Sequence, residues 1–255
     1  VSAGDSNTKG NQYVWVPIGK VKYNTSGATK TINFGRYDFE SNVAGDLKQS
    51  ADNYTSKVTI ETYFQELSSS NYGNTVAKNL GDFITKAKAA GGYYIGRYEA
   101  GKVSGNTNTF NVKKGQTVYN NITQPKAANL ARNLYSSNSN FESDLINSYA
   151  WDTAIVFIQT FSGDTDYSRQ NSLQSSRTTT GNAHDSNNNY DVRCNIYDMA
   201  GNVREWSTET FTNSSGPCVG RGGSYGSSVY CTAYRYYYSP SYSYTSLAFR
   251  STLYL

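Results

Sequence analysis

The chain has 255 residues, of which 37% are hydrophobic and 15% are aromatic, and its formal net charge is +4 at pH 7. Its 23 basic and 19 acidic residues are scattered, without the clustered Lys/Arg stripe that a phosphate backbone needs, so no nucleic-acid partner is expected. The sequence also lacks a run of about 18 apolar residues, which excludes a membrane-spanning helix from it.

Tyrosine and cysteine usage set limits on the core. The 24 tyrosines carry hydroxyls that need a partner or water, which suits walls and surfaces better than a dry core centre. The 3 cysteines, Cys194, Cys218 and Cys231, leave at least one thiol unpaired in an oxidising compartment. We therefore expect a loop-rich fold with an aromatic surface, held together by its core rather than by disulfides.

The predicted elements alternate between short strands and helices. Aromatic and β-branched residues predict strands at residues 13–18, 20–23, 31–34, 57–64 and 93–98. Apolar residues spaced by three and four predict helices at residues 74–90, 123–135 and 141–161. We expect residues 162–192 to be a long polar loop, whose residues 163–189 are a mobile lid or disordered, and short strands and turns to follow from Cys194. The sequence has no repeat and no evident linker, which favours one domain.

Five pieces near the end of the chain form a recognisable series. They are Asn195-Ile-Tyr-Asp-Met-Ala-Gly-Asn-Val-Arg-Glu-Trp206, Arg221-Gly-Gly-Ser224, Ala233-Tyr-Arg235, Pro240 and Ala248-Phe-Arg250. Their order and spacing resemble the signature of the formylglycine-generating-enzyme-like (sulfatase-modifying factor) branch of the C-type lectin fold. The resemblance covers roughly residues 90–255.

This resemblance implies an α+β fold, the formylglycine-generating-enzyme-like variant of the C-type lectin fold, with two main helices, irregular short strands and an N-terminal elaboration. It implies one domain over residues 1–255, with 24–90 as a family-specific insertion and the first and last strands paired. Residues 221–250 then form an excursion on an exposed face. We expect Gly222, Gly223 and Trp206 to be scaffold, since Gly permits close backbone approach and Trp fills a core position.

Enzymatic members of the resembled family use residues that this chain lacks. Those that oxidise a cysteine to formylglycine use a cysteine pair, which alignment on Ala233 and Arg235 places at Ser227 and Thr232. Hydroxyls are poor substitutes for the thiolates of a soft copper site. Sulfoxide-synthase relatives need a histidine cluster, whereas the 1 histidine here, His184, is expected to be a solvated loop residue. The sequence therefore predicts no enzyme and no required cofactor.

The C-terminal segment instead resembles the variable proteins of diversity-generating retroelements, which are ligand-binding lectin-like domains rewritten by adenine-directed mutagenesis. Residues 225–247 hold eight Tyr and six Ser, one Arg, and no Lys, Asp or Glu. Tyr, Ser, Gly, Thr, Val and Cys are products of that mutagenesis, so Cys231 is incidental in this interpretation. Tyr and Ser also dominate antibody loops, because Tyr offers rigid amphipathic area at low entropic cost.

The predicted ligand-binding residues all lie in this segment. They are Tyr225, Ser227, Ser228, Val229, Tyr230, Tyr236, Tyr237, Tyr238, Ser239, Tyr242, Ser243 and Tyr244. An aromatic core strand followed by a polar loop is the alternative, and Tyr234 and Phe249 are candidate core residues in either case.

Calcium is one metal that the resemblance allows. Matching residues would be the side chains of Asp198 and Glu205 and the carbonyls of Gly201 and Val203, and hard oxygen ligands suit calcium. The same two carboxylates equally suit turn caps without an ion.

The sequence thus predicts a diversified binding protein of adhesin type at a bacterial surface, outside the cell or on a phage particle, with no anchor in this chain. Its partner is a protein or other cell-surface ligand. The alternatives are a formylglycine-generating oxidase and a carbohydrate-binding module.

Overall fold

The computed structural model describes residues 5–37, 39, 64–65, 80–170, 179–184, 187–211, 215–226 and 230–255. Helices and many short strands are mixed in it, as an α+β fold requires. Ser227, Ser228 and Val229 lie outside the described residues, as do most of the strand predicted at 57–64 and the first residues of the helix predicted at 74–90. Within the described part, no helix is both long and apolar enough to cross a membrane.

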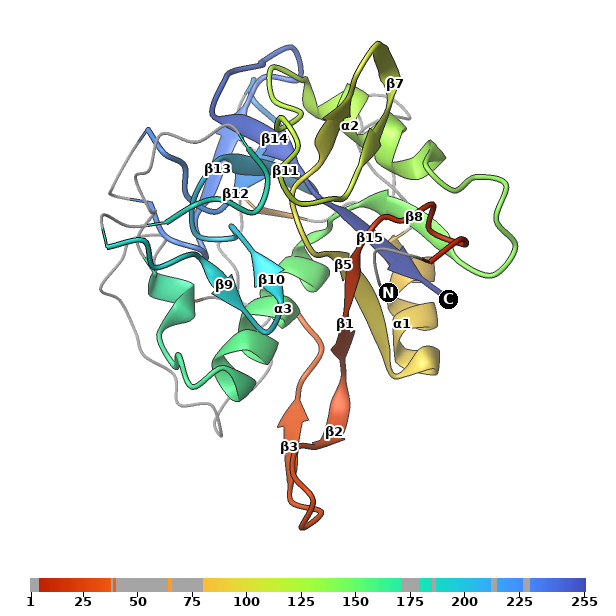
Figure 1. Ribbon diagram of the computed structural model, residues 1–255, viewed down its shortest axis with the longest axis vertical. Coiled ribbons are helices and arrows are strands. Elements are labelled where there is room, and N and C mark those ends of the chain that lie inside the picture. Colours follow the sequence, from red (N-terminus) through yellow and green to blue (C-terminus); the bar gives the residue numbers. More distant parts are fainter. Residues whose placement is uncertain are drawn as a thin grey trace.

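A four-stranded antiparallel sheet brings the two ends of the chain together (Figure 1). Its order is β1 (Tyr13–Pro17), β5 (Gly92–Gly96), β15 (Ser251–Tyr254) and β8 (Glu142–Leu145). The expected direct pairing of the first and last strands is therefore wrong, because β5 lies between them. Tyr93 and Ile95 of β5 are fully buried, as suits a central strand, whereas Pro17 cannot donate to a ladder and places β1 at an edge.

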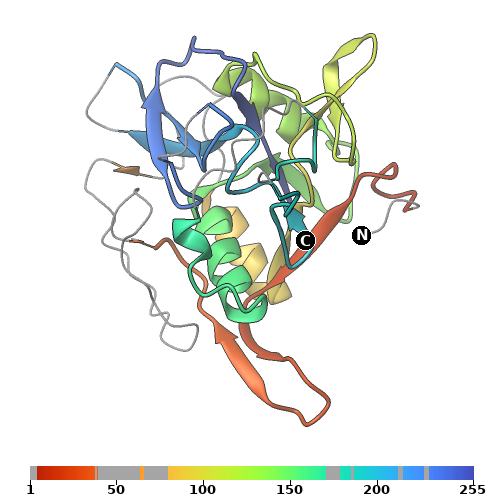
Figure 2. The ribbon, with the colours of Figure 1, turned by 60° about the vertical axis from the view of Figure 1, so that its left-hand side comes forward.

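Three α-helices occur in the described residues: α1 (Leu80–Ala90), α2 (Gln124–Asn133) and α3 (Ser148–Phe161). Gly91, with φ +74°, follows the end of α1, and Pro125 stands in the first turn of α2. α1 lies on β5 and β15, and α3 contacts β1, β5 and β11, so it lies between the two sheets of the molecule (Figure 2). That position explains why α3 is buried on nearly every side.

The helix predicted over 141–161 is wrong in its first part. Residues 142–145 form β8, where Leu145 pairs with Ser251, and the helix begins only at Ser148. Asn147 caps it, because its side-chain oxygen accepts a hydrogen bond from the Ala150 N–H at 2.8 Å. Leu145 fits the helical spacing of the apolar residues, but it is buried by the sheet instead.

The second sheet carries the C-terminal segment. Its order is β13 (Arg235–Tyr238), β12 (Cys218–Arg221), β11 (Arg204–Phe211) and β14 (Leu247–Phe249), with β4 (Phe64–Gln65) also paired to β11. β14 runs parallel to β11, so the chain crosses over between β13 and β14. Trp206 on β11 and Phe249 on β14 are fully buried, which confirms Trp206 as a core residue.

Three two-stranded hairpins complete the fold. They are β2–β3 (Gly19–Lys22 and Thr29–Ile32), β6–β7 (Gly101–Val103 and Asn106–Asn111) and β9–β10 (Val192–Arg193 and Ile196–Tyr197). The β2–β3 hairpin projects from the body (Figures 1 and 2). A short 3₁₀ helix, η1 (Tyr167–Arg169), follows α3 and packs against it.

Candidate ligand-binding surface

Tyrosine rings of the C-terminal segment, together with Phe211 of β11, lie ring against ring in two rows, which we call the tyrosine ladder. The first row is Phe211, Tyr237, Tyr236, Tyr234 and Tyr230, with centroids of consecutive rings 4.2, 5.2, 6.0 and 4.2 Å apart. The second row is Tyr238, Tyr242 and Tyr244, at 4.7 and 6.2 Å. An edge contact between Tyr236 and Tyr238, at 5.1 Å, joins the two rows.

The outer rings of the tyrosine ladder face solvent. Tyr236, Tyr237, Tyr242 and Tyr244 are 39%, 40%, 39% and 55% exposed. Few other large hydrophobic residues of the described chain are exposed, and these four lie within nine residues of sequence. A contiguous aromatic patch of this kind usually marks an interaction site.

The other predicted binding residues are placed around the ladder. Ser239 and Ser243 are exposed, while Tyr230 and Tyr238 are half-buried. Tyr225 is also half-buried, and its hydroxyl donates to Thr245 Oγ1 at 3.0 Å. Tyr234 is half-buried inside the first row rather than in the core, whereas Phe249 is fully buried.

Arg204, which the sequence analysis did not single out, lies beneath the ladder. Its guanidinium carbon is 4.5, 5.1, 5.8 and 5.9 Å from the ring centroids of Tyr230, Tyr234, Tyr236 and Tyr238. Its Nη1 donates to the Tyr238 hydroxyl and its Nε to the Gly222 carbonyl. The residue is 7% exposed, so the cation is held against ring faces away from water.

A buried cluster of four charges, which we call the charge square, lies at the end of the β12–β13 pair where Arg221 pairs with Arg235. Arg221 and Arg235 donate to Asp152 on α3, each at 2.6 Å, and to Glu209 on β11 at 3.0 and 2.8 Å. These side chains are between 0% and 4% exposed, so the pairs are shielded from solvent. Arg36 adds a further contact to Glu209 at 2.5 Å.

The charge square determines the ionisation of Glu209. Burial alone would raise the pKa of its carboxyl, but the guanidinium groups of Arg235, Arg221 and Arg36 outweigh burial and lower that pKa to about 2. Glu209 is therefore ionised at neutral pH and lies between the guanidinium groups that surround it. It fixes the strand from which Tyr236, Tyr237 and Tyr238 extend.

Gly222 is a position where the backbone leaves no room for a side chain. Its φ is +77°, and a Cβ there would lie 2.5 Å from the Met199 carbonyl oxygen and 3.1 Å from the Trp151 ring. A close backbone approach at this glycine is what the sequence predicts. Gly222 allows the chain to turn out of β12 directly above Trp151.

Gly222→Ala should lower the free energy of unfolding by more than the roughly 1–2 kcal/mol that a left-handed backbone costs an alanine. Gly27→Ala is the matched control, because Gly27 also has positive φ, +81°, but nothing lies within 4 Å of its Cβ position. Urea denaturation of both variants separates the cost of the left-handed backbone from the cost of the close contacts with Met199 and Trp151. Equal losses would show that the approach to Met199 and Trp151 is not tight.

A comparison with protein-family models identifies the chain. The model of the sulfatase-modifying factor enzyme 1-like domain (FGE-sulfatase) matches residues 88–250. The chain belongs to this family. The match spans β5 to β14 and so includes the charge square, Arg204 and the ladder's tyrosines. The predicted α+β fold, in the formylglycine-generating-enzyme-like variant of the C-type lectin fold, is confirmed.

Two solved structures are similar to the chain. The crystal structure of CarF is 17% identical, covers 77% of this chain and 94% of its own, and has a TM-score of 0.46. Treponema denticola variable protein 1 is 15% identical, covers 99% of this chain and 97% of its own, and has a TM-score of 0.33. A comparison with curated proteins gave no match. Because both TM-scores are low, the family assignment rests on the sequence match.

The carboxylates that FGE-sulfatase resemblance assigns to calcium are engaged by other groups. Both oxygens of Glu205 accept hydrogen bonds from Arg250, at 2.6 and 2.8 Å, and the oxygens of Asp198 accept from the N–H groups of Asn182 and Ala183, each at 3.1 Å. A guanidinium in that position repels a second cation. The side chains present therefore do not fit calcium at Glu205, and a melting temperature that rises with added calcium would contradict this interpretation.

The cysteines of this FGE-sulfatase chain do not form a reactive pair. Cys194, Cys218 and Cys231 are all free, and the latter two are buried. Burial raises the pKa of the Cys218 thiol to about 12 and that of the Cys231 thiol to about 11. Thr232, at one position of the oxidase cysteine pair, is fully buried as well. The buried cysteines are thus held as neutral thiols at neutral pH.

The expectation for His184 is wrong. It is only 9% exposed, and its ring packs on that of Tyr190 at 5.2 Å. The loop folds back on itself through a bridge between these two residues, which covers the imidazole. The polar composition of the segment suggested a solvated loop, and it does not reveal the contact with Tyr190 that covers the ring.

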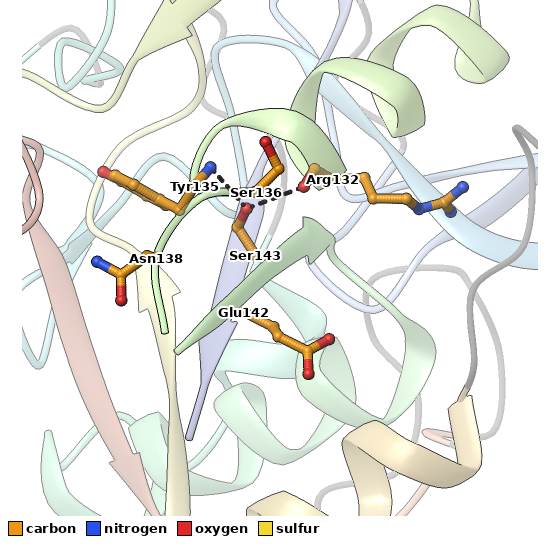
Figure 3. A pocket seen from close by; sticks show the side chains of 6 residues that line it. All are labelled: Arg132, Tyr135, Ser136, Asn138, Glu142 and Ser143. Carbon is orange, nitrogen blue, oxygen red and sulfur yellow. Dashed lines mark hydrogen bonds between the residues drawn. The ribbon is translucent and has the colours of Figure 1, made fainter. Parts of the chain in front are cut away.

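The pocket drawn in Figure 3 lies away from the ladder, between the end of α2 and β8. Its volume is about 290 Å³, and its lining residues are Arg132, Tyr135, Ser136, Asn138, Glu142 and Ser143. Ser143 Oγ accepts from the Tyr135 N–H at 3.3 Å and donates to the Arg132 carbonyl at 3.4 Å (Figure 3). These polar groups bond to one another, and none of the lining residues belongs to the tyrosine ladder.

Proposed function

We propose that this chain is a ligand-binding variable protein diversified by a retroelement, displayed outside the cell, at its surface or on a phage particle. Its Tyr/Ser-rich surface recognises a protein or other cell-surface ligand. The observation that carries this proposal is the tyrosine ladder: exposed stacked rings lie on a strand whose start is fixed by the buried charge square.

The division between buried and exposed residues supports binding that tolerates change. Arg221, Arg235 and Arg250 are buried in ion pairs, and Tyr236, Tyr237, Tyr242 and Tyr244 face solvent between them. Replacement of an exposed ring leaves those buried pairs intact, and substitutions away from buried features usually change stability by less than about 0.5 kcal/mol. Such a surface is able to vary while the fold persists.

The chemistry of the buried thiols supports a protein that is not an enzyme. Oxidation of a substrate cysteine needs accessible thiolates, and Cys218 and Cys231 are buried with raised pKa values. Incubation with copper and a cysteine-containing peptide should yield no formylglycine by mass spectrometry. Copper-dependent aldehyde formation would instead support the oxidase alternative.

The DNA around the coding sequence tests the retroelement. We expect a near-identical copy of the stretch encoding residues 221–250, differing at adenines, beside a reverse transcriptase gene. Sequencing of related isolates should then show substitutions concentrated at the exposed tyrosines and serines of the ladder. A locus with no such copy would contradict diversification, and substitutions spread evenly over the domain would do the same.

A further inference from the structure

The faces of most rings in the ladder are occupied by other rings. Tyr237 lies between Phe211 and Tyr236, with interplanar angles of 8° and 7°. Tyr236 is followed by Tyr234 at 19°, and Tyr242 lies between Tyr238 and Tyr244 at 14° and 24°. Sugars that bind by stacking need an open ring face. The groups that remain available to a ligand are therefore the ring edges and the tyrosine hydroxyls.

Those edges and hydroxyls favour a partner rich in hydrogen-bond acceptors. The edge of an aromatic ring is the positive side of its quadrupole. The described part of the chain gives no hydrogen-bond partner to the hydroxyls of Tyr236, Tyr237, Tyr242 and Tyr244, which are exposed. Ser239, Ser241 and Ser243 add further exposed hydroxyls beside them.

The charge beneath the ladder has no carboxylate partner. Arg221 and Arg235 are paired with Asp152 and Glu209, and Arg250 with Glu205. Arg204, although also buried, forms no salt bridge within the described residues, and its Nη2 has no hydrogen-bond partner there. Residues 225–247 contain no Asp or Glu, so no carboxylate of this segment balances the charge of Arg204.

Arg204 also directs a hydroxyl proton. Its Nη1 donates to the oxygen of Tyr238, so the Tyr238 O–H remains free to donate to another group. A hydroxyl that accepts from a cation becomes a stronger donor, because hydrogen bonds in a chain polarise one another. Tyr238 is half-buried at the junction of the two rows, where its ring contacts those of Tyr236 and Tyr242.

We infer that the tyrosine ladder receives an acidic protein surface, whose carboxylates accept hydrogen bonds from the tyrosine hydroxyls above Arg204. This inference rests on the proposed function and specifies its partner. Arg204 is then a fixed specificity-determining residue beneath a varying face. Positive charge held under neutral rings attracts carboxylates and disfavours lysine-rich surfaces, and this preference weakens as salt screens it.

A displayed library of disulfide-constrained random peptides tests the inference with the whole chain as the immobilised target. Selected peptides should be enriched in Asp and Glu over the unselected library, and their binding should weaken as sodium chloride is raised. Arg204→Met should weaken the selected peptides about tenfold, the size of one modest charge interaction. Arg204→Lys, which keeps the charge, should recover part of the loss. Arg132→Met, an arginine removed on α2 away from the ladder, should bind like the parent chain.

The outcomes distinguish this inference from the proposed function. Peptides whose binding is lost in Tyr236→Ala/Tyr237→Ala but which show no acidic excess, or which bind Arg204→Met unchanged, would overturn the acidic partner and leave ligand binding standing. Binding on a glycan array through the same tyrosines, without acidic peptides, would also overturn it. Peptide binding that ignores the tyrosine substitutions, or no binding of peptides or glycans, would contradict the proposed function itself. Thermal melts confirm that each variant is folded before its binding is compared.

Discussion

Asp152→Asn should lower the free energy of unfolding by about 3–5 kcal/mol, the usual cost of removing one partner from a buried ion pair. Asp152 is fully buried, and its two oxygens accept from Arg221 and Arg235 at 2.6 Å each. It also accepts from the Tyr37 N–H at 2.9 Å. Without its charge, two guanidinium groups remain buried with only Glu209 to balance them. Urea denaturation monitored by far-ultraviolet circular dichroism measures the loss.

Asp82→Asn is the matched control for this substitution. Asp82 lies on α1, is 34% exposed, and pairs with Lys86 one helical turn along the chain. An exposed pair of this kind contributes about 0.3–0.5 kcal/mol, so the control should be nearly silent. If Asp152→Asn were as mild as Asp82→Asn, the charge square would not be a buried network.

The charge square should also make stability depend on pH in the acid range. The folded-state pKa of Glu209 is lowered to about 2, whereas an unfolded Glu titrates at about 4.3. A lowered folded pKa stabilises the fold above the unfolded pKa, and this contribution is lost as the pH falls through the interval toward about 2. Glu209→Gln should flatten that part of the stability curve. An unchanged acid limb would show that folding does not lower the pKa of Glu209.

Trp151→Ala should lower the free energy of unfolding by about 3–5 kcal/mol, because it removes a large buried ring and leaves a cavity. Trp151 on α3 is fully buried, its indole N–H donates to the Thr232 carbonyl at 3.0 Å, and its ring lies under Gly222. The substitution should therefore also loosen the tyrosine ladder, which near-ultraviolet circular dichroism reports through the tyrosine signal.

Trp15→Ala is the comparison for Trp151. Trp15 on β1 is half-buried, packs edge-on against Tyr94 at 4.9 Å, and lies away from the second sheet. Its removal should cost less and leave the tyrosine signal of the ladder in place once the tryptophan contribution is subtracted. Equal effects of the two substitutions on that signal would mean that Trp151 does not support the C-terminal segment.

Local sequence was sufficient to predict the features that depend on one residue and its neighbours in the chain. Trp206 and Gly222 were expected as scaffold, and the structure buries the indole and uses positive φ at the glycine. Gly91 ends α1 and Pro125 stands in the first turn of α2, as their backbone preferences require. In each case the decisive property belongs to one residue and its neighbours in the chain.

Features that depend on contacts between segments far apart in the chain could not be predicted from the sequence. β5 separates β1 from β15 because strand order is decided by pairing between segments far apart. Leu145 had a helical spacing but lies in β8, although Asn147 offered a capping signal that could have moved the helix start. Arg204 was passed over inside its motif. Arg204 and the buried Trp206 lie two residues apart on β11 and therefore on the same face of the strand. That spacing was the signal that the arginine side chain is buried as well.

The parallel pairing of β14 with β11 makes the C-terminal segment replaceable. Leu247 and Phe249 are in register with Arg204 and Trp206, so the chain rejoins the sheet as β14 after it leaves β13. Residues 239–246 lie between the two anchor points and outside every strand. The length and composition of this loop therefore do not affect the register of the sheet. A foreign loop could be grafted between β13 and β14, because both strands are already paired within the sheet.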